Sequence, residues 1–124
     1  DVMTTKAKAI NDFFNGVMRS YPQSAVPDDA KTPYLTYAWN EGSFGDENQA
    51  ITVNIYARTD SEAEINAMAR KLSDAIGRGG HVISCDDGAI WLKRGSPWCQ
   101  AAPYDDLSIK RRYINVSAEF LTID

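Results

Sequence analysis

Residues 49–59, QAITVNIYART, decide the fold class because they carry the clearest strand pattern in the chain. Their apolar side chains alternate with polar or larger ones, as Ile51, Val53, Ile55 and Ala57 against Thr52, Asn54, Tyr56 and Arg58. Successive side chains of a strand point to opposite faces of its sheet, so this period of two predicts a strand with one buried face.

The residues that follow, DSEAEINAMARKLSDAIG at 60–77, predict a helix. Its apolar residues recur at the spacing of one helical face, namely Ile65, Met68, Ala69, Leu72 and Ile76. Ser61 and Glu64 form an S-x-x-E capping box at its start. Gly77 stands where a left-handed residue commonly ends a helix, and the glycines after it prevent continuation.

Toward the N-terminus, residues 34–39 (YLTYAW) are rich in aromatic and β-branched side chains and predict another strand. A polar loop at 40–48 joins the two strands. Residues 21–33 hold three prolines and predict a loop, because proline removes a hydrogen-bond donor and fixes φ. A first helix is predicted from about Thr5 to Met18. Its apolar face consists of Ile10, Phe13, Phe14 and Val17.

Toward the C-terminus, residues 81–85 (HVISC) and 89–94 (AIWLKR) predict a hairpin, because the intervening DDG sequence favours a tight turn. Residues 95–108 lack periodicity and predict an irregular arm. The last predicted strand runs from roughly Lys110 to Ile123.

The predicted order of elements is α-β-β-α-β-β-β over a single domain, residues 1–124. Strands joined by short turns pair antiparallel, and two helices with one apolar stripe each can cover one face of a sheet. The sequence therefore predicts an α+β fold. We expect a two-layer sandwich in which two helices pack on one face of a mostly antiparallel sheet of about five strands.

The composition excludes several classes of protein. No apolar run approaches the roughly 20 residues that cross a bilayer, and the first residues resemble an amphipathic helix rather than a signal peptide. Two cysteines do not make a disulfide framework, so we expect reduced thiols in a cytosolic setting. The net charge of −4 disfavours general nucleic-acid binding, although residues 78–112 hold six bases against four acids.

Residues with catalytic chemistry do not form a recognisable site. A regular strand would place His81 and Cys85 roughly 13 Å apart, too far for both to bind one zinc ion. The aspartate pairs at 86–87 and 105–106 are typical of turns. GRGG at 77–80 follows a helix, whereas a phosphate-binding loop precedes one. We therefore expect no enzyme activity, no metal and no cofactor.

Three segments are distinctive when taken together: GRGG at 77–80, CDDGAIWLKRGSPW at 85–98 and KRRYINVSAEFLT at 110–122. With PYLTYAW at 33–39 upstream, the chain resembles the tail terminator proteins of long-tailed bacteriophages and prophages, which complete the tail and join it to the head. The resemblance covers nearly the whole chain.

The resemblance implies a structural protein that lies in the virion at the head–tail junction and assembles in the host cytoplasm. Such proteins form a ring, commonly a hexamer, that caps the tail tube, ends tail polymerisation and presents the surface that joins the head. The implied partners are copies of the chain, the tail tube protein and a head-completion or neck protein. Genomic DNA is expected to pass through the ring without specific binding, and no membrane is involved.

Tryptophan and arginine are enriched at interface hot spots, and a ring forms when a contact between two different patches closes on itself. We therefore predict that the arm at 95–108 and the loop at 40–48 reach a neighbouring subunit or the tube. The predicted interface has Arg94, Lys110, Arg111 and Arg112 on a basic side, Glu41, Asp46 and Glu47 on an acidic side, and Lys93 and Trp98 beside the bases. Whether Trp91 or Trp98 is the buried tryptophan stays open.

Other functions stay open as well. The chain could be another neck or head-closure protein of a phage, or a minor tail protein. A different class is a small-molecule-binding α+β regulatory module, which requires an apolar pocket with a few polar groups. A thiol enzyme that uses Cys85 or Cys99 requires a base and a third, orienting group.

Overall fold

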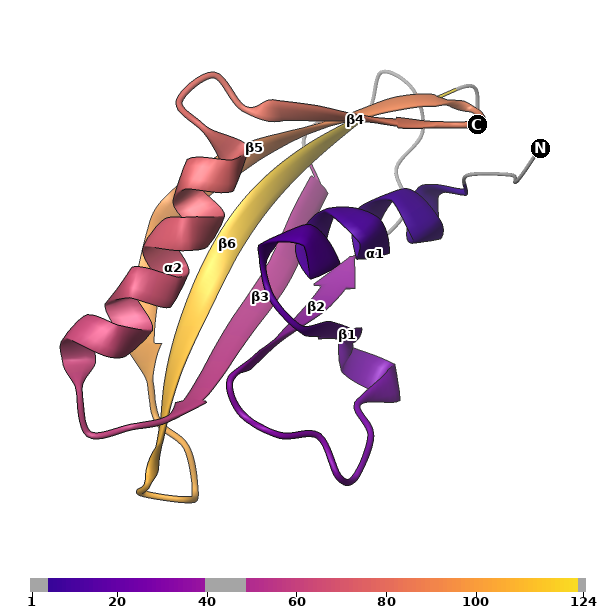
Figure 1. The fold of residues 1–124 in the computed structure, drawn as a ribbon. Coiled ribbons are helices and arrows are strands. Elements are labelled where there is room, and N and C mark those ends of the chain that lie inside the picture. Colours follow the sequence, from indigo (N-terminus) through magenta and orange to yellow (C-terminus); the bar gives the residue numbers. More distant parts are fainter. Residues whose placement is uncertain (1–4, 40–48, 123–124) are drawn as a thin grey trace.

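The computed structural model describes residues 5–39 and 49–122, which form helices, strands and one short 3-10 turn (Figure 1). In chain order these elements are α1 (Lys6–Val17), β1 (Ser20–Pro22), η1 (Gln23–Ala25), β2 (Tyr34–Trp39), β3 (Gln49–Arg58), α2 (Glu62–Ile76), β4 (His81–Cys85), β5 (Gly88–Ala102) and β6 (Ile109–Thr122). Helices and strands are thus combined as the α+β prediction requires.

The strands of the described residues form one mixed sheet in the order β1-β2-β3-β6-β5-β4. Four neighbouring pairs are antiparallel, but β1 runs parallel to β2. This sheet of six strands corrects the predicted count of about five. The additional strand, β1, lies in the stretch that the prolines assign to a loop, and it is only three residues long because Pro22 ends it.

Helix α2 starts and ends where its sequence signals predict. The Ser61 hydroxyl accepts a hydrogen bond from the backbone N–H of Glu64 at 3.2 Å. The Glu64 carboxylate accepts from the Thr59 hydroxyl at 2.7 Å, and the Thr59 oxygen in turn accepts from the Ser61 backbone N–H at 3.0 Å. The capping box is therefore closed through Thr59. Gly77 ends the helix with φ +79°.

Helix α1 lies inside the curve of the sheet. Its Phe14 ring stacks on Tyr37 of β2 with centroids 4.9 Å apart, and its Asn11 side chain accepts a hydrogen bond from the Tyr37 hydroxyl at 2.8 Å. Its Phe13 ring lies 5.4 Å from the His81 ring of β4. Because β2 and β4 are far apart in the strand order, the sheet has to curl for one helix to contact both (Figure 1).

Strand β5 corrects the prediction of an irregular arm. The predicted strand at 89–94 continues through most of the predicted arm, and β5 ends only at Ala102. The pairing of β5 with β6 shifts register between Arg94 and Cys99, which marks a bulge. Residues 103–108 alone form the connection to β6.

The bulge accommodates residues that disfavour a regular strand. A Cβ atom at Gly95 would lie 2.7 Å from the backbone oxygen of Asn115 in β6, so glycine is required where the two backbones approach. The Asn115 side chain donates a hydrogen bond to the Pro97 carbonyl at 2.7 Å. This contact ties the bulge to β6.

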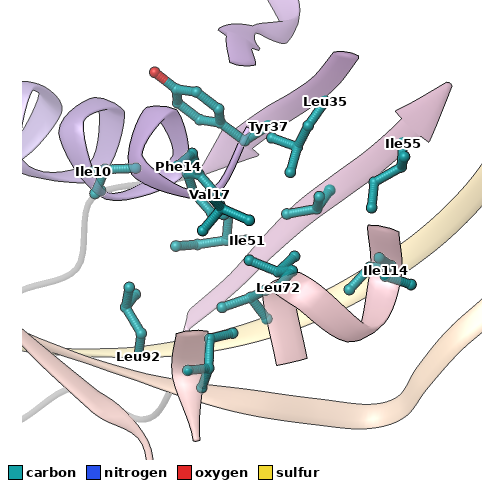
Figure 2. Packing of buried hydrophobic residues seen from close by; sticks show 14 of the residues in the cluster. Ile10, Phe14, Val17, Leu35, Tyr37, Ile51, Ile55, Leu72, Leu92 and Ile114 are labelled. Atoms are coloured by element: carbon teal, nitrogen blue, oxygen red, sulfur yellow. The ribbon is translucent and has the colours of Figure 1, made fainter. Parts of the chain in front are cut away.

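The core lies between the helices and one face of the sheet. In Figure 2, Ile10 and Phe14 of α1 and Leu72 of α2 lie among side chains of the strands. The fully buried side chains of the sheet include Leu35, Ile51, Val53, Ile55, Ile90, Leu92 and Ile114. Among the described residues, no helix is long and apolar enough to cross a membrane.

Candidate interaction surface

The face of the sheet opposite the core, here called the open face, carries polar and aromatic side chains. Along β6 the residues alternate strictly: Arg112, Ile114 and Val116 are buried, whereas the residues between them are partly exposed. The registers place the partly exposed side chains of neighbouring strands on the same side. The main members are Thr52, Tyr56 and Arg58 on β3 with the buried Asn54 between them, Arg111, Tyr113, Asn115, Ser117 and Glu119 on β6, and Trp91 and Lys93 on β5.

One end of the open face holds a row of tyrosine rings. Tyr21 contacts Tyr34 with centroids 5.8 Å apart, Tyr34 contacts Tyr56 at 5.2 Å, and Tyr56 contacts Tyr104 at 5.2 Å. The Arg111 guanidinium lies over the Tyr56 ring, 6.0 Å from its centroid. These five residues are called the tyrosine–arginine cluster below. Burial, followed by the neighbouring tyrosines, raises the pKa of Tyr34 and so favours its neutral hydroxyl.

Arg111 is held in place by neutral partners. Its Nε donates to the Asn54 side chain at 2.8 Å, and its Nη1 donates to the Pro103 carbonyl at 3.4 Å. The Asn54 side chain is buried in the sheet, so it holds the Arg111 guanidinium in a fixed position. No carboxylate of the described residues forms an ion pair with Arg111. The charge of the guanidinium is therefore not neutralised by a described carboxylate, and several of its N–H donors are unused.

The other two bases of the KRR sequence, Lys110 and Arg112, are turned toward α2. Glu62 at the start of that helix pairs with the Lys110 ammonium at 3.1 Å and with the Arg112 guanidinium. Arg112 also donates to the Asn66 side chain at 3.2 Å and is only 7% exposed. Hydrogen bonds from Lys110 and then Arg112 lower the pKa of Glu62. These two bases fasten α2 to β6, and their predicted place in an interface stays a prediction.

Trp91 and Lys93 form a second group on the open face. The Trp91 indole donates a hydrogen bond to the Gly79 carbonyl at 3.0 Å, and the Lys93 ammonium lies 4.4 Å from the Trp91 ring centroid. Trp91 and Trp98 are both partly buried, and Trp98 packs against the core. Neither Trp91 nor Trp98 is therefore fully buried, and of the two it is Trp98 that packs against the core.

The remaining predicted residues lie in different places. Arg94 is exposed beside the bulge, opposite Val116 on β6, and no described carboxylate pairs with it. The acidic residues Glu41, Asp46 and Glu47 lie outside the described residues. The structure therefore brings Lys93 and Arg111 onto one face and turns Lys110 and Arg112 to the other.

The connection between β5 and β6, residues 103–108, forms an exposed tip that was not predicted as a separate feature. Asp106 accepts hydrogen bonds from the Ser108 backbone N–H at 2.9 Å and from the Ser108 hydroxyl at 2.6 Å, and Arg58 pairs with Asp106 at 3.4 Å. This ordered turn presents Leu107, which is 96% exposed. The signal in the sequence was a single leucine within the polar run DDLS.

The residues considered for thiol chemistry do not form a nucleophile and base. Burial raises the pKa of the Cys99 thiol, which disfavours the reactive thiolate. Cys85 is partly buried against the core, and His81 lies against Phe13. Within residues 5–39 and 49–122, no group of three or more His, Cys, Asp or Glu side chains could hold a metal ion.

One cavity of about 590 Å³ opens between α1, η1 and β2. Its lining includes Ala7, Pro22, Tyr37 and Trp39, with polar contributions from Gln23 and Ser24. A cavity of this kind is what a small-molecule-binding module would need, so that alternative stays a hypothesis.

Comparison with known proteins identifies a shared fold. No protein-family model matches the sequence, and no curated protein matches it. A chain in the structure "Virion of native gene transfer agent (GTA) particle" superposes with a TM-score of 0.60 and 15% sequence identity over 92% of both chains. The likeness extends over nearly the whole domain, which shows that the two chains have the same fold.

Proposed function

We propose that this chain is a structural protein of a phage-like particle, and that its place is the end of the tail. The observation that carries the proposal is the fold shared with a chain of the gene transfer agent virion over 92% of both chains. The segments that resemble tail terminator proteins support the finer assignment, since they include β2 and most of β5 and β6, half of the strands in the described sheet. The chain would form a ring, commonly of six subunits, on the last ring of tail tube protein.

The proposed ring closes through contacts between different patches of neighbouring copies. Lys93, Arg94 and Arg111 are bases without an acidic partner among the described residues, so they are available to a second molecule. The acidic side of the contact would come from Glu41, Asp46 and Glu47. Complementary charge of this kind sets register and speeds association more than it adds affinity.

The proposed partners are copies of the chain, the tail tube protein and a head-completion or neck protein. The protein would act at the head–tail junction of the virion after assembly in the host cytoplasm, with genomic DNA passing through the ring. Binding surfaces and ring geometry suffice for this role, which includes no chemical step and no cofactor.

Deletion of the gene in its particle-producing host tests the proposal. We expect overlong tails without heads, because nothing would stop tube polymerisation or present a surface for the head. Tail lengths and head attachment are measured by electron microscopy, and a plasmid copy of the gene serves as the control. Tails of normal length without heads would favour another neck protein, and normal particles would contradict both assignments.

A further inference from the structure

The three consecutive bases of β6, Lys110, Arg111 and Arg112, lie on two different faces of the sheet. Lys110 and Arg112 are neutralised by Glu62 within the chain. Arg111 points to the open face and has only neutral acceptors, the Asn54 side chain and the Pro103 carbonyl. A charge that is fixed in place but not neutralised is suited to bind a carboxylate of another molecule.

The surroundings of Arg111 strengthen this argument. A guanidinium has five N–H donors in a rigid plane, and the two hydrogen bonds to Asn54 and Pro103 leave donors for a bidentate contact. The Tyr56 ring beneath it and the neighbouring Tyr104, which is 40% exposed, provide apolar contact area. Tyrosine and arginine are among the residue types that contribute most to binding in protein interfaces.

The charge of the open face indicates the chemistry of its partner. Among its described members, Lys93 and Arg111 are bases without an acidic partner, Arg58 pairs with Asp106, and Glu119 is acidic, so basic charge exceeds acidic charge on this face in a chain with a net charge of −4. The acids that lack a described partner include Asp86 and Asp87, which form the exposed turn between β4 and β5. Another copy of this chain can therefore supply the complementary charge.

The acidic turn cannot reach Arg111 of its own chain. Gly88, next to the turn, pairs with Thr122, whereas Arg111 lies eleven residues earlier on β6. At the rise of a strand this is a separation of about 36 Å. Figure 1 shows the turn and the β5–β6 connection at opposite ends of the sheet. A contact between them has to join two molecules head to tail, as a ring requires.

From these observations we infer that the tyrosine–arginine cluster binds the Asp86–Asp87 turn of a second copy, with Arg111 as the residue that holds the carboxylates. This assigns Arg111 to the turn and leaves the acidic loop at 40–48 as the partner of Arg94. The inference rests on the proposed function, because it names the surface through which the ring closes. Lys93 lies on the same face and adds to the attraction.

Charge reversal on each side tests the inference. Arg111→Glu and the double variant Asp86→Lys/Asp87→Lys are each expected to weaken self-association at least about tenfold, and mixing the two variants is expected to restore it. Association is measured by sedimentation velocity on the full chain at low ionic strength. Arg70→Glu, on the exposed side of α2, is the matched control and should associate as the wild type does.

The turn variant guards against a loss of fold, because Asp86 and Asp87 are exposed and do not touch Arg111. Unchanged association of both variants, or a wild-type chain that stays monomeric at the highest concentration reached, would overturn the inference. If Arg111→Glu abolished binding to duplex DNA without changing self-association, the inference would also be overturned, since Arg111 would then be a DNA contact. The deletion phenotype is scored separately. Overlong tails in the deletion strain, together with unchanged association of the charge-reversal variants, would refute only this contact.

Discussion

At the scale of the residue, Gly80 sets the position of Trp91 on the open face. Its φ of +87° lies in the left-handed region, and a Cβ there would lie 2.6 Å from the Leu92 carbonyl oxygen. We expect Gly80→Ala to lower the free energy of unfolding by about 2 kcal/mol, because backbone strain and a close contact act together. Gly79→Ala is the control, since a Cβ at Gly79 meets nothing within 4 Å. Urea denaturation measures both, and equal losses would contradict the prediction.

Glu62 is one residue through which pH acts on the stability of this fold. Hydrogen bonds from Lys110 and Arg112 lower its pKa in the folded state, so the carboxylate stabilises the fold at pH values above the ordinary glutamate pKa of about 4.3. That contribution is lost as the pH falls through the lowered value. We expect Glu62→Gln to be less stable than the wild type at pH 7, with the difference shrinking toward pH 3. Thermal unfolding at several pH values measures it, and a difference independent of pH would exclude this role.

At the scale of the element, local signals predicted the helices, whereas β1 and the extension of β5 were not predicted because they depend on long-range pairing. Thr5 and Ser61 cap the two helices, and the apolar stripes face the core, because these features depend on neighbouring residues alone. The extension of β5 depends instead on Asn115 and on a bulge that absorbs Gly95. Parallel pairing of β1 with β2 is equally non-local, so three residues ending in proline gave no signal.

The candidate surface was predictable only in part, because local patterns show which way a side chain points but not which distant residue it meets. The alternation along β6 extends to Arg112, which shares its face with Ile114 and Val116, so the sequence contained the signal that Arg112 points inward. The partner of Arg112 could not be predicted, because Glu62 lies fifty residues away and is brought near by the packing of α2. Arg111, Asn54 and Tyr56 likewise meet only through the β3–β6 register.

At the scale of the whole molecule, the shared fold shows which properties of the sequence are constrained. Only 15% of the residues agree with those of the virion chain, although 92% of both chains superpose. A core tolerates many substitutions as long as its volume and its pattern of apolar residues are kept. Surface features such as the tyrosine–arginine cluster are not fixed by the fold, so they carry the information about the partners of this particular chain.

A substitution at the exposed tip between β5 and β6 can change assembly without changing the stability of the fold. Leu107 is 96% exposed on a turn ordered by Asp106 and Ser108, so its removal costs the isolated chain almost nothing. If the predicted arm reaches a neighbour or the tube, Leu107→Ser is expected to leave the free energy of unfolding within about 0.5 kcal/mol of the wild type and to reduce ring formation on tail tubes. Ala67→Ser, at an exposed position of α2, is the control. Urea denaturation and electron microscopy of capped tubes measure the two quantities, and normal capping by Leu107→Ser would place the tip outside every interface.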